Sequence, residues 1–291
     1  MGEFFSIACA AVWALAVVLF RRSGETLPAF ELNLFKNLLA LPPMVLTVWI
    51  VGEPLLPSFT PREWAIVLAS GTIGIAVADT WYLRALNLMG AARTGVTASL
   101  FSPFVVLLSA LLLGERLRGW QLAGFSLVLA GILLVTWRSR RIDVSPDALR
   151  LGLFYGAGAV LMMAIGIVMV KPILEGEHFF ATAALRLAAG ALSMAAFVAV
   201  AGSWRTVLAR YRQPQPWPTI VFASLLASYF SMLLWLAGYR LAPASVASVL
   251  NETAAAFIVL FAWLMLGESL SPRRLVGVFV TFCGVTVMLL L

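Results

Sequence analysis

Long apolar runs separated by short polar segments form the basic pattern of this chain. A helix needs about 17–25 mostly apolar residues to cross the hydrocarbon core of a bilayer. Ten runs meet that requirement, and most of their connections are too short to hold a soluble domain. The pattern therefore predicts an all-α membrane protein with ten transmembrane helices, over residues 4–20, 30–51, 64–83, 91–113, 121–137, 151–170, 179–201, 217–241, 245–266 and 274–291.

The two halves of the chain match each other at a nearly constant spacing. Lys36 in the second predicted helix corresponds to Arg186 in the seventh, 150 residues further on. A Leu-Gly-Glu motif at 113–115 recurs at 266–268, an offset of 153 residues. Such agreement indicates a repeat. Because five is an odd number of helices, the second unit would enter the membrane upside down, as in many secondary transporters. We expect two inverted five-helix repeats, residues 1–137 and 151–291, joined by a linker at 138–150.

The composition indicates that the protein is apolar on its outer surface, which faces lipid, as well as in its interior. The 291 residues are 62% hydrophobic and 11% charged, whereas a soluble domain carries about 25% charged residues. The formal net charge is +7, which in another protein would suggest nucleic-acid binding. Here the arginines stand at the ends of apolar runs, as the positive-inside rule describes. We therefore expect a lipid bilayer, and no nucleic acid, as the partner of this surface.

The arginines also predict an orientation. Alternate connections collect most of them, including Arg21, Arg22, the group at 138–141 and the segment 205–212. The positive-inside rule places this side in the cytoplasm, so both termini are predicted to be extracytoplasmic. Arginine outnumbers lysine by 18 to 2, and alanine is abundant. This bias fits a GC-rich bacterium, and we expect a multi-pass protein of its inner membrane.

Several chemistries lack the residues they need. Cys9 and Cys283 both lie inside apolar runs, and His178 is the single histidine. These residues provide neither zinc-site spacing nor a disulfide framework. No phosphate-binding loop and no nucleophile elbow are present. We predict no cofactor, no metal and no enzymatic activity. Two alternatives stay open, a membrane-embedded enzyme and a channel-like structural subunit.

The third to fifth helices of each half carry a recognisable pattern. An aromatic-rich helix end (WYLRALN from Trp81, WLAGYRL from Trp235) is followed by a small-residue turn and an apolar helix. That helix closes with Leu-Gly-Glu, and a glycine-containing helix follows. In these features the chain resembles the drug/metabolite transporter superfamily, of the EamA type. It departs from the family pattern at Trp13-Ala14, at Lys36 and at Ala256, which stands opposite Pro103. The resemblance implies ten helices in two inverted repeats and transport of a small metabolite or drug-like solute, often outward.

Ionisable groups within the apolar runs are the first candidates for function, because they are costly there and usually face a cavity or a partner. Asp79 and Glu252 could bind and release a proton, or pair with a cationic substrate. Asn251 beside Glu252 suggests polar surroundings. The alternative is a structural ion pair, such as Asp79 with Arg84 or Lys36. Lys36 and Arg186 could bind an anionic substrate group, neutralise the carboxylates, or extend toward the interface. Asn33, Lys36 and Asn37 share roughly one helix face.

Aromatic side chains in the third and eighth helices could line a substrate path or hold a cation, although many membrane aromatics mark interfaces. These candidates are Trp81, Tyr82, Tyr229, Trp235 and Tyr239. Pro103 is expected to kink the fourth helix and could act as a hinge. The glutamates of the two Leu-Gly-Glu motifs are interpreted as structural, each lying near the positive N-terminus of the next helix.

Together these features favour a secondary transporter that works by alternating access, with a small-molecule substrate. Export and coupling to protons are hypotheses within that interpretation. The sequence leaves the substrate, the coupling ion and the choice between monomer and homodimer open.

Overall fold

The computed structural model describes residues 1–291 except 23–26, 137–144, 268–270 and 291. Within the described residues every regular element is helical. The first half holds α1 (Gly2–Arg22), α2 (Ala29–Val51), α3 (Pro61–Gly71), the π-helix η1 (Thr72–Val77), α4 (Ala78–Ala98), α5 (Phe101–Leu112) and α6 (Gly119–Thr136). The second holds α7 (Pro146–Leu174), α8 (Phe179–Val200), α9 (Trp204–Arg212), α10 (Trp217–Leu225), the π-helix η2 (Leu226–Phe230), α11 (Ser231–Leu241), α12 (Ala244–Asn251), α13 (Ala254–Leu266) and α14 (Pro272–Leu290).

Eight described segments are long and apolar enough to cross a membrane: Gly2–Phe20, Phe30–Val51, Pro61–Tyr82, Pro146–Leu174, Phe179–Val200, Trp217–Leu241, Ala244–Met265 and Pro272–Leu289. Large apolar side chains such as Phe197, Leu264 and Phe279 remain exposed on them, as expected of helices that face lipid. The predicted fourth and fifth spans are represented by the shorter apolar helices Phe101–Leu112 and Gly119–Leu134. The prediction of ten full spans is therefore confirmed only for eight of them.

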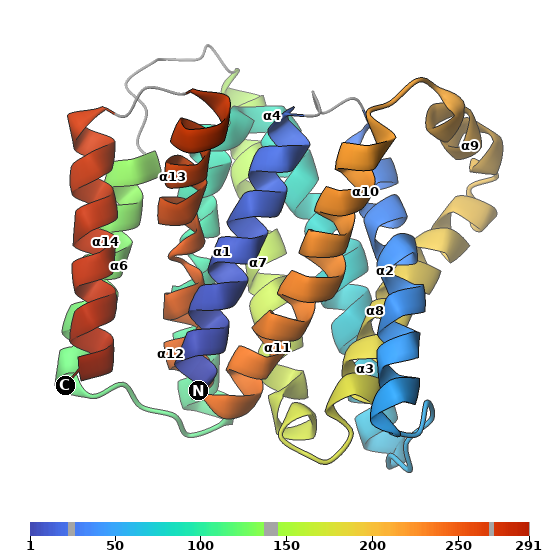
Figure 1. Ribbon diagram of the computed structural model, residues 1–291, viewed down its shortest axis with the longest axis horizontal. Helices are drawn as coiled ribbons and strands as arrows, with labels where there is room; N and C mark the ends of the chain where they lie inside the picture. The colour runs from blue at the N-terminus through green and yellow to red at the C-terminus, as the bar shows by residue number, and fades with distance from the viewer. Residues whose placement is uncertain (23–26, 137–144, 268–270, 291) are drawn as a thin grey trace.

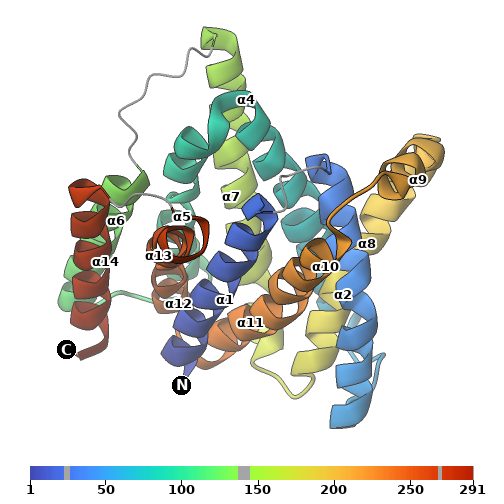
Figure 2. The same ribbon diagram turned by 45° about the horizontal axis from the view of Figure 1, so that its top comes forward.

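The helices form one bundle in which both termini lie at the same end (Figure 1). At one edge of the bundle α6 packs against α14, and the rotated view in Figure 2 shows the same pairing. Their contact is close because a Cβ on Gly131 would lie 2.3 Å from Thr281 Oγ1 and one on Gly284 would lie 2.7 Å from the Gly124 carbonyl. Small residues at such crossings allow backbones to touch in the absence of a hydrophobic driving force.

The centre of the bundle is formed by α7 and α8 packed against helices of the first half. Glycines of α7 face α4: Gly152 lies against Met89, Gly156 against Thr97 and Gly158 against Trp81. On the other side α8 packs on α2, α3 and η1. The largest buried cluster runs through this region, from Met44 of α2 to Ile167 of α7 and Leu187 of α8.

One connection differs from its predicted form. A turn was expected between the third and fourth helices, over 84–90, but α4 continues through it to Ala98. The reason is local: arginine, alanine, leucine and methionine, all good helix formers, make up most of the segment, and it contains no proline. The corresponding connection of the second half does break, because Ala242 precedes Pro243 and is forced into an extended conformation (φ −135°, ψ 159°).

The fourth helix of each half is broken at a matching position. In the first half α4 ends at Ala98 and α5 begins at Phe101. Pro103 lies in the first turn of α5 and has no N–H to donate to the preceding turn. In the second half α12 ends at Asn251 and α13 begins at Ala254, 153 residues after Phe101. The break in the predicted fourth span is thus at Ser99–Leu100, just before the helical turn that contains Pro103.

A short surface helix, α9, was not foreseen from the sequence. It lies at the end of the bundle opposite the termini, beyond α8 and α10 (Figures 1 and 2). Val207 is buried, and the Tyr211 hydroxyl donates to the Glu31 carbonyl at 2.8 Å. Burial, with a smaller contribution from Glu31, raises the pKa of this tyrosine. The helix carries Arg205, Arg210 and Arg212.

Candidate functional site

The ion pair of Lys36 and Asp79 joins α2 to α4. Lys36 Nζ donates to Asp79 Oδ2 at 3.1 Å, and the two side chains are 13% and 21% exposed. The ammonium also lies 5.7 Å from the centroid of the Trp13 ring. Of the two partners considered for Asp79, the structure selects Lys36. Arg84 instead stacks over Tyr155 of α7, 5.1 Å from its ring centroid.

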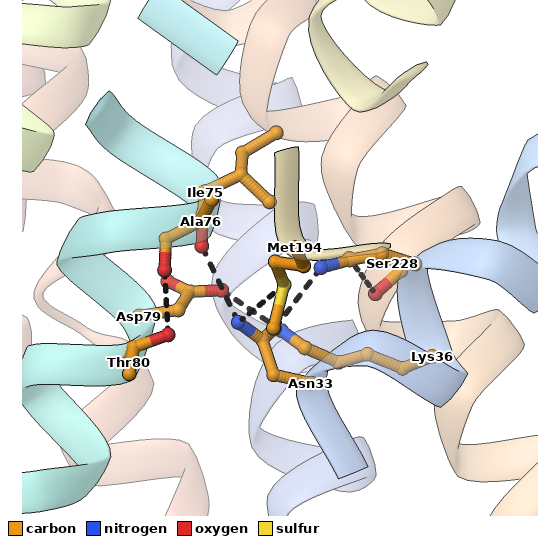
Figure 3. A network of polar contacts seen from close by, with 9 residues as sticks. Asn33, Lys36, Ile75, Ala76, Asp79, Thr80, Met194 and Ser228 are labelled. Carbon is orange, nitrogen blue, oxygen red and sulfur yellow. Dashed lines mark hydrogen bonds and ion pairs between the residues drawn. The ribbon is translucent and has the colours of Figure 1, made fainter. Parts of the chain in front are cut away.

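A neutral polar network continues from this pair toward α8 and η2 (Figure 3). Asn33 Nδ2 donates to the Ile75 carbonyl at 3.3 Å and contacts Met194 Sδ at 3.5 Å. Asn37 Nδ2 donates to Asn33 Oδ1 at 3.0 Å, and the Ser228 hydroxyl donates to Asn37 Oδ1 at 3.2 Å. The shared face predicted for these α2 residues therefore meets both π-helices.

Those π-helices occupy corresponding positions in the two halves. η1 covers Thr72–Val77 and η2 covers Leu226–Phe230, about 153 residues apart. Single π-helical turns are rare and frequently accompany functional sites. Here η1 supplies the Ile75 carbonyl that holds Asn33, and η2 supplies Ser228. Neither turn was predicted, and only packing of the folded chain reveals them.

Arg186 is buried at the junction of α8 with α3, η1 and α11. It is 1% exposed. Its Nε donates to Ser70 Oγ at 2.9 Å, and the guanidinium lies 5.6 Å from the centroid of the Trp235 ring. The Nη1 atom has no hydrogen-bond partner among the described residues. The two cations of the predicted repeat thus have different surroundings.

Glu252 occupies the break between α12 and α13. Its Oε1 accepts a hydrogen bond from the Ser102 hydroxyl at 2.7 Å. Ser102 is the second residue of α5, so the carboxylate stands at a helix N-terminus, where the dipole favours an anion. The neighbouring Asn251 donates from Nδ2 to the Ala247 carbonyl of its own helix at 2.8 Å, while its Oδ1 has no hydrogen-bond partner within the described part of the chain.

The aromatic candidates fall into two groups. Tyr82 lies near enough to Asp79 and Glu252 for both charges to act on its hydroxyl, and Tyr239 is also near Glu252. Trp235 packs edge-on against Tyr239 at 5.2 Å between ring centroids. Trp81 instead packs among Phe154 and Tyr155 of α7. Tyr229 hydrogen-bonds the Thr47 hydroxyl at 2.5 Å. The structure therefore gathers Tyr82, Trp235 and Tyr239 near the buried charges and places Trp81 and Tyr229 in other contacts.

Two charged residues hold the turn between α11 and α12, and the sequence did not assign them this role. Lys171 Nζ donates to the carbonyls of Tyr239 at 2.8 Å and Ala242 at 3.1 Å, and it also pairs with Glu175. Glu115 accepts from the backbone amides of Ala244 at 2.9 Å and Ser245 at 3.0 Å. A cation at a helix C-terminus and an anion at the next N-terminus both complement the helix dipoles.

Glu115 was expected near the start of the helix that follows it, and this expectation is wrong. Its carboxylate instead caps α12 in the other half of the chain. The free amides of α12 attract it, since Pro243 before them offers no side-chain cap. The second such glutamate, Glu268, lies outside the described residues.

Two hollows formed by described residues lie away from the polar network. One of about 610 Å³ lies on α2, between Leu41, Trp49 and Leu55. Another of about 230 Å³ is bordered by Phe59, Glu63 and His178. Among the described residues no group of three His, Cys, Asp or Glu side chains is arranged to hold a metal ion.

Comparison with known proteins agrees with this arrangement. A family model described as the EamA-like transporter family matches residues 1–137 and again 150–290. The chain belongs to the EamA-like transporter family. As a member of this family and of the wider drug/metabolite transporter superfamily, it is a multi-pass membrane protein and a transporter.

One relative and one solved structure match this EamA-like chain over almost its whole length. An "Uncharacterized transporter" of Archaeoglobus fulgidus is 23% identical over 281 residues, which are 94% of this chain and 92% of that protein. A solved structure described as "Crystal structure of protein" superposes with a TM-score of 0.79 at 20% sequence identity, covering 99% of this chain and 95% of the other. At that identity the second likeness shows the fold alone.

Proposed function

We propose that this protein is a secondary transporter that exports a small metabolite or drug-like solute by alternating access, driven by protons. The two halves, residues 1–137 and 151–291, would act as inverted five-helix repeats about the buried polar residues. The protein would lie in a bacterial inner membrane with both termini extracytoplasmic. Support comes from the two matches to one family model and from the position of both termini at one end of the bundle.

The observation that carries proton coupling is the isolation of Glu252. Among the described residues no cation lies within 4 Å of its carboxylate, in contrast to Asp79, which is paired with Lys36. An isolated carboxylate within the membrane is costly and must be neutralised by a proton or a cationic group. Glu252 is therefore the better candidate for the group that binds the coupling proton, and Asp79 the better candidate for a structural ion pair.

The position of Glu252 also suggests how a proton could act on the fold. The carboxylate belongs to the second half but accepts its hydrogen bond at the start of α5 in the first half. Protonation would remove the charge that the N-terminus of α5 stabilises. That contact between the halves would weaken, at a point where both helices are already broken. Among the described residues, the hydroxyls of Tyr82 and Tyr239 lie close enough to Glu252 for its charge to act on them.

The proposal is tested by reconstituting the full chain in liposomes and recording substrate-induced currents on solid-supported membranes. Pools of amino acids, amines and organic acids are applied with and without a pH gradient. We expect a current that depends on the gradient and is lost in Glu252→Gln. Asp147→Asn is the matched control, because it also replaces a carboxylate by an amide but at an exposed position. We expect this variant to keep the substrate-induced current of the unmodified protein.

Isotope exchange on the same vesicles extends the test to electroneutral transport. Counterflow that is insensitive to pH in the unmodified protein, or unchanged pH dependence in Glu252→Gln, would reject the coupling step. Sustained currents without substrate would favour a channel and reject alternating access.

A further inference from the structure

Arg186 is a buried cation without a counter-ion in the part of the chain that the structure describes. Its side chain is enclosed by α3, η1 and α11, and its charge has no acidic group within 4 Å among the described residues. The Ser70 hydroxyl, a neutral group, occupies Nε. A buried charge normally has a partner of opposite sign, since desolvation costs several kcal/mol per ion. The guanidinium can therefore bind an anion from outside the described part of the chain.

On the side of η1, no described side chain covers the guanidinium at Gly74. At Gly74, a Cβ would meet a single atom within 4 Å, Arg186 Nη2 at 3.6 Å. Most other helical glycines of this protein are crowded by neighbours; at Gly71, one residue before η1, a Cβ would lie 2.2 Å from the Arg186 carbonyl. The backbone thus approaches the arginine closely at Gly71 and leaves room beside its guanidinium one turn later.

Two donor atoms of the guanidinium are relevant to this side. Nη1 is buried and lacks a hydrogen-bond partner in the described part of the chain, and Nη2 borders the space at Gly74. Arginine binds carboxylates with two parallel N–H donors, and such charge-assisted bonds are short and strong. On the opposite side Trp235 offers an aromatic face that is partly accessible. An acid with an apolar body would satisfy both the donors and the ring.

We propose that Arg186, with Gly74 and Trp235, forms the binding site for the carboxylate group of the transported solute, so that the substrate class is a small organic acid. This inference rests on the proposed transport function and adds the chemical class of substrate to it. The bound carboxylate would replace the missing counter-ion, and Trp235 would pack against the apolar part. Arg186 has no part in the proton step assigned to Glu252.

The test compares acids with their neutral isosteres on the purified full-length protein. Thermal unfolding is followed with acetate, benzoate and succinate at millimolar concentration, and with acetamide, benzamide and succinamide, at equal ionic strength. We expect at least one acid to raise the unfolding temperature while its amide does not. Loss of one charge-assisted contact corresponds to about 10- to 100-fold weaker binding, and we expect that loss in Arg186→Met.

A second variant guards against a misfolded arginine mutant. Gly74→Leu keeps the arginine and fills the space beside it, so it should abolish the effect of the acid as well. Gly119→Ala is the control, because a Cβ there meets nothing within 4 Å.

The site assignment is overturned if amides stabilise as well as acids, if no acid of the panel stabilises, or if stabilisation persists in both variants. These results would leave the proposed function standing wherever Glu252-dependent currents are found with amines or other solutes. If the unmodified protein gives no such currents but still binds the acid, the proposed transport cycle is rejected and the assignment of the binding site stands.

Discussion

Lys36 and Arg186 correspond in the predicted repeat, 150 residues apart, yet among the described residues an acidic partner is found for Lys36 alone. Lys36 bonds Asp79 at 3.1 Å, whereas Arg186 has no acid within reach in the described residues. The position that corresponds to Asp79, 153 residues further on, is Met232. Of the two cations matched in the predicted repeat, Lys36 thus has a carboxylate partner, and Arg186 has none among the described residues. In the first half the cation is neutralised by a carboxylate of the same half. In the second half the cation can pair with a bound anion, as the site proposed above requires.

The largest effect is expected from giving the second half the acid it lacks. Met232 lies three residues before Trp235 on α11, and residues at that spacing share a helix face, so we expect a side chain at 232 on the side where Trp235 meets Arg186. Met232→Asp would place a carboxylate near the guanidinium and compete with any bound acid. We expect acid binding to weaken by about 100-fold, the equivalent of nearly 3 kcal/mol, as measured by the ligand-induced shift in unfolding temperature.

The neutral substitution Met232→Asn is the control for this experiment. It changes the size and polarity of the side chain in the same way but adds no charge. Equal losses in the two variants would contradict the comparison, because the effect would then come from packing and not from a new ion pair.

A smaller effect, which separates the two sites more directly, is expected on the free energy of unfolding when each cation is removed alone. Lys36→Met leaves the Asp79 carboxylate half-buried and unpaired, and should lower the free energy of unfolding by about 2 kcal/mol. Arg186→Met removes a charge that has no partner, and should change it by about 0 kcal/mol or stabilise the protein. Unfolding by SDS titration in mixed micelles measures both.

The double variant Lys36→Met/Asp79→Asn checks the cause. If the pair accounts for the loss, neutralising Asp79 should restore most of the stability. Equal destabilisation by the two single cation variants would show that the paired and unpaired sites do not differ energetically.

The smallest effect is expected at the turn between α11 and α12. Glu115 reaches from the first half to cap α12, and Glu115→Ala should cost about 1 kcal/mol, the usual value of a helix N-cap. In the first half, the position that corresponds to Pro243 is Gly90, which lies inside α4. No helix begins there, so no glutamate can act as an N-cap unless a substitution such as Gly90→Pro first breaks the helix. Asp147→Asn is the exposed control in the same SDS titration, and a loss equal to that control would contradict the capping role.

Hydrophobicity predicted the location of the main helices well, because a spanning helix is defined by the length of its apolar run. The second predicted helix, 30–51, coincides with the apolar segment found in α2. Hydrophobicity predicted a connection over 84–90 because polar residues interrupt the apolar run there, and this was wrong. Polar residues indicate a connection only where the helix backbone also ends. Pro243 supplies that break in one half, and the alanines beside Gly90 do not.

The sequence identified the charged candidates but not most of their partners. Depth in the membrane can be estimated from position along a helix, whereas the direction in which a side chain points depends on how helices pack. Lys36 was considered for Asp79 because both charges lay in neighbouring helices. Ser102 beside Glu252 and Ser70 beside Arg186 carry no comparable signal, since serine is common and uncharged. The roles of these residues in transport remain predictions.

The π-helix η1 lets the first half hold one residue more than a regular helix of the same path would need. An α-helix turns by about 100° per residue, and a π-helical turn accommodates one extra residue within the helix. Deleting a single residue between Thr72 and Val77 would therefore restore a regular helix and leave the residues after it close to their present places. Asp79 would stay beside Lys36, whereas the wide turn that brings the Ile75 carbonyl to Asn33 would be lost. In comparing relatives, a one-residue gap in this segment would thus signal a changed Asn33 contact with the ion pair kept.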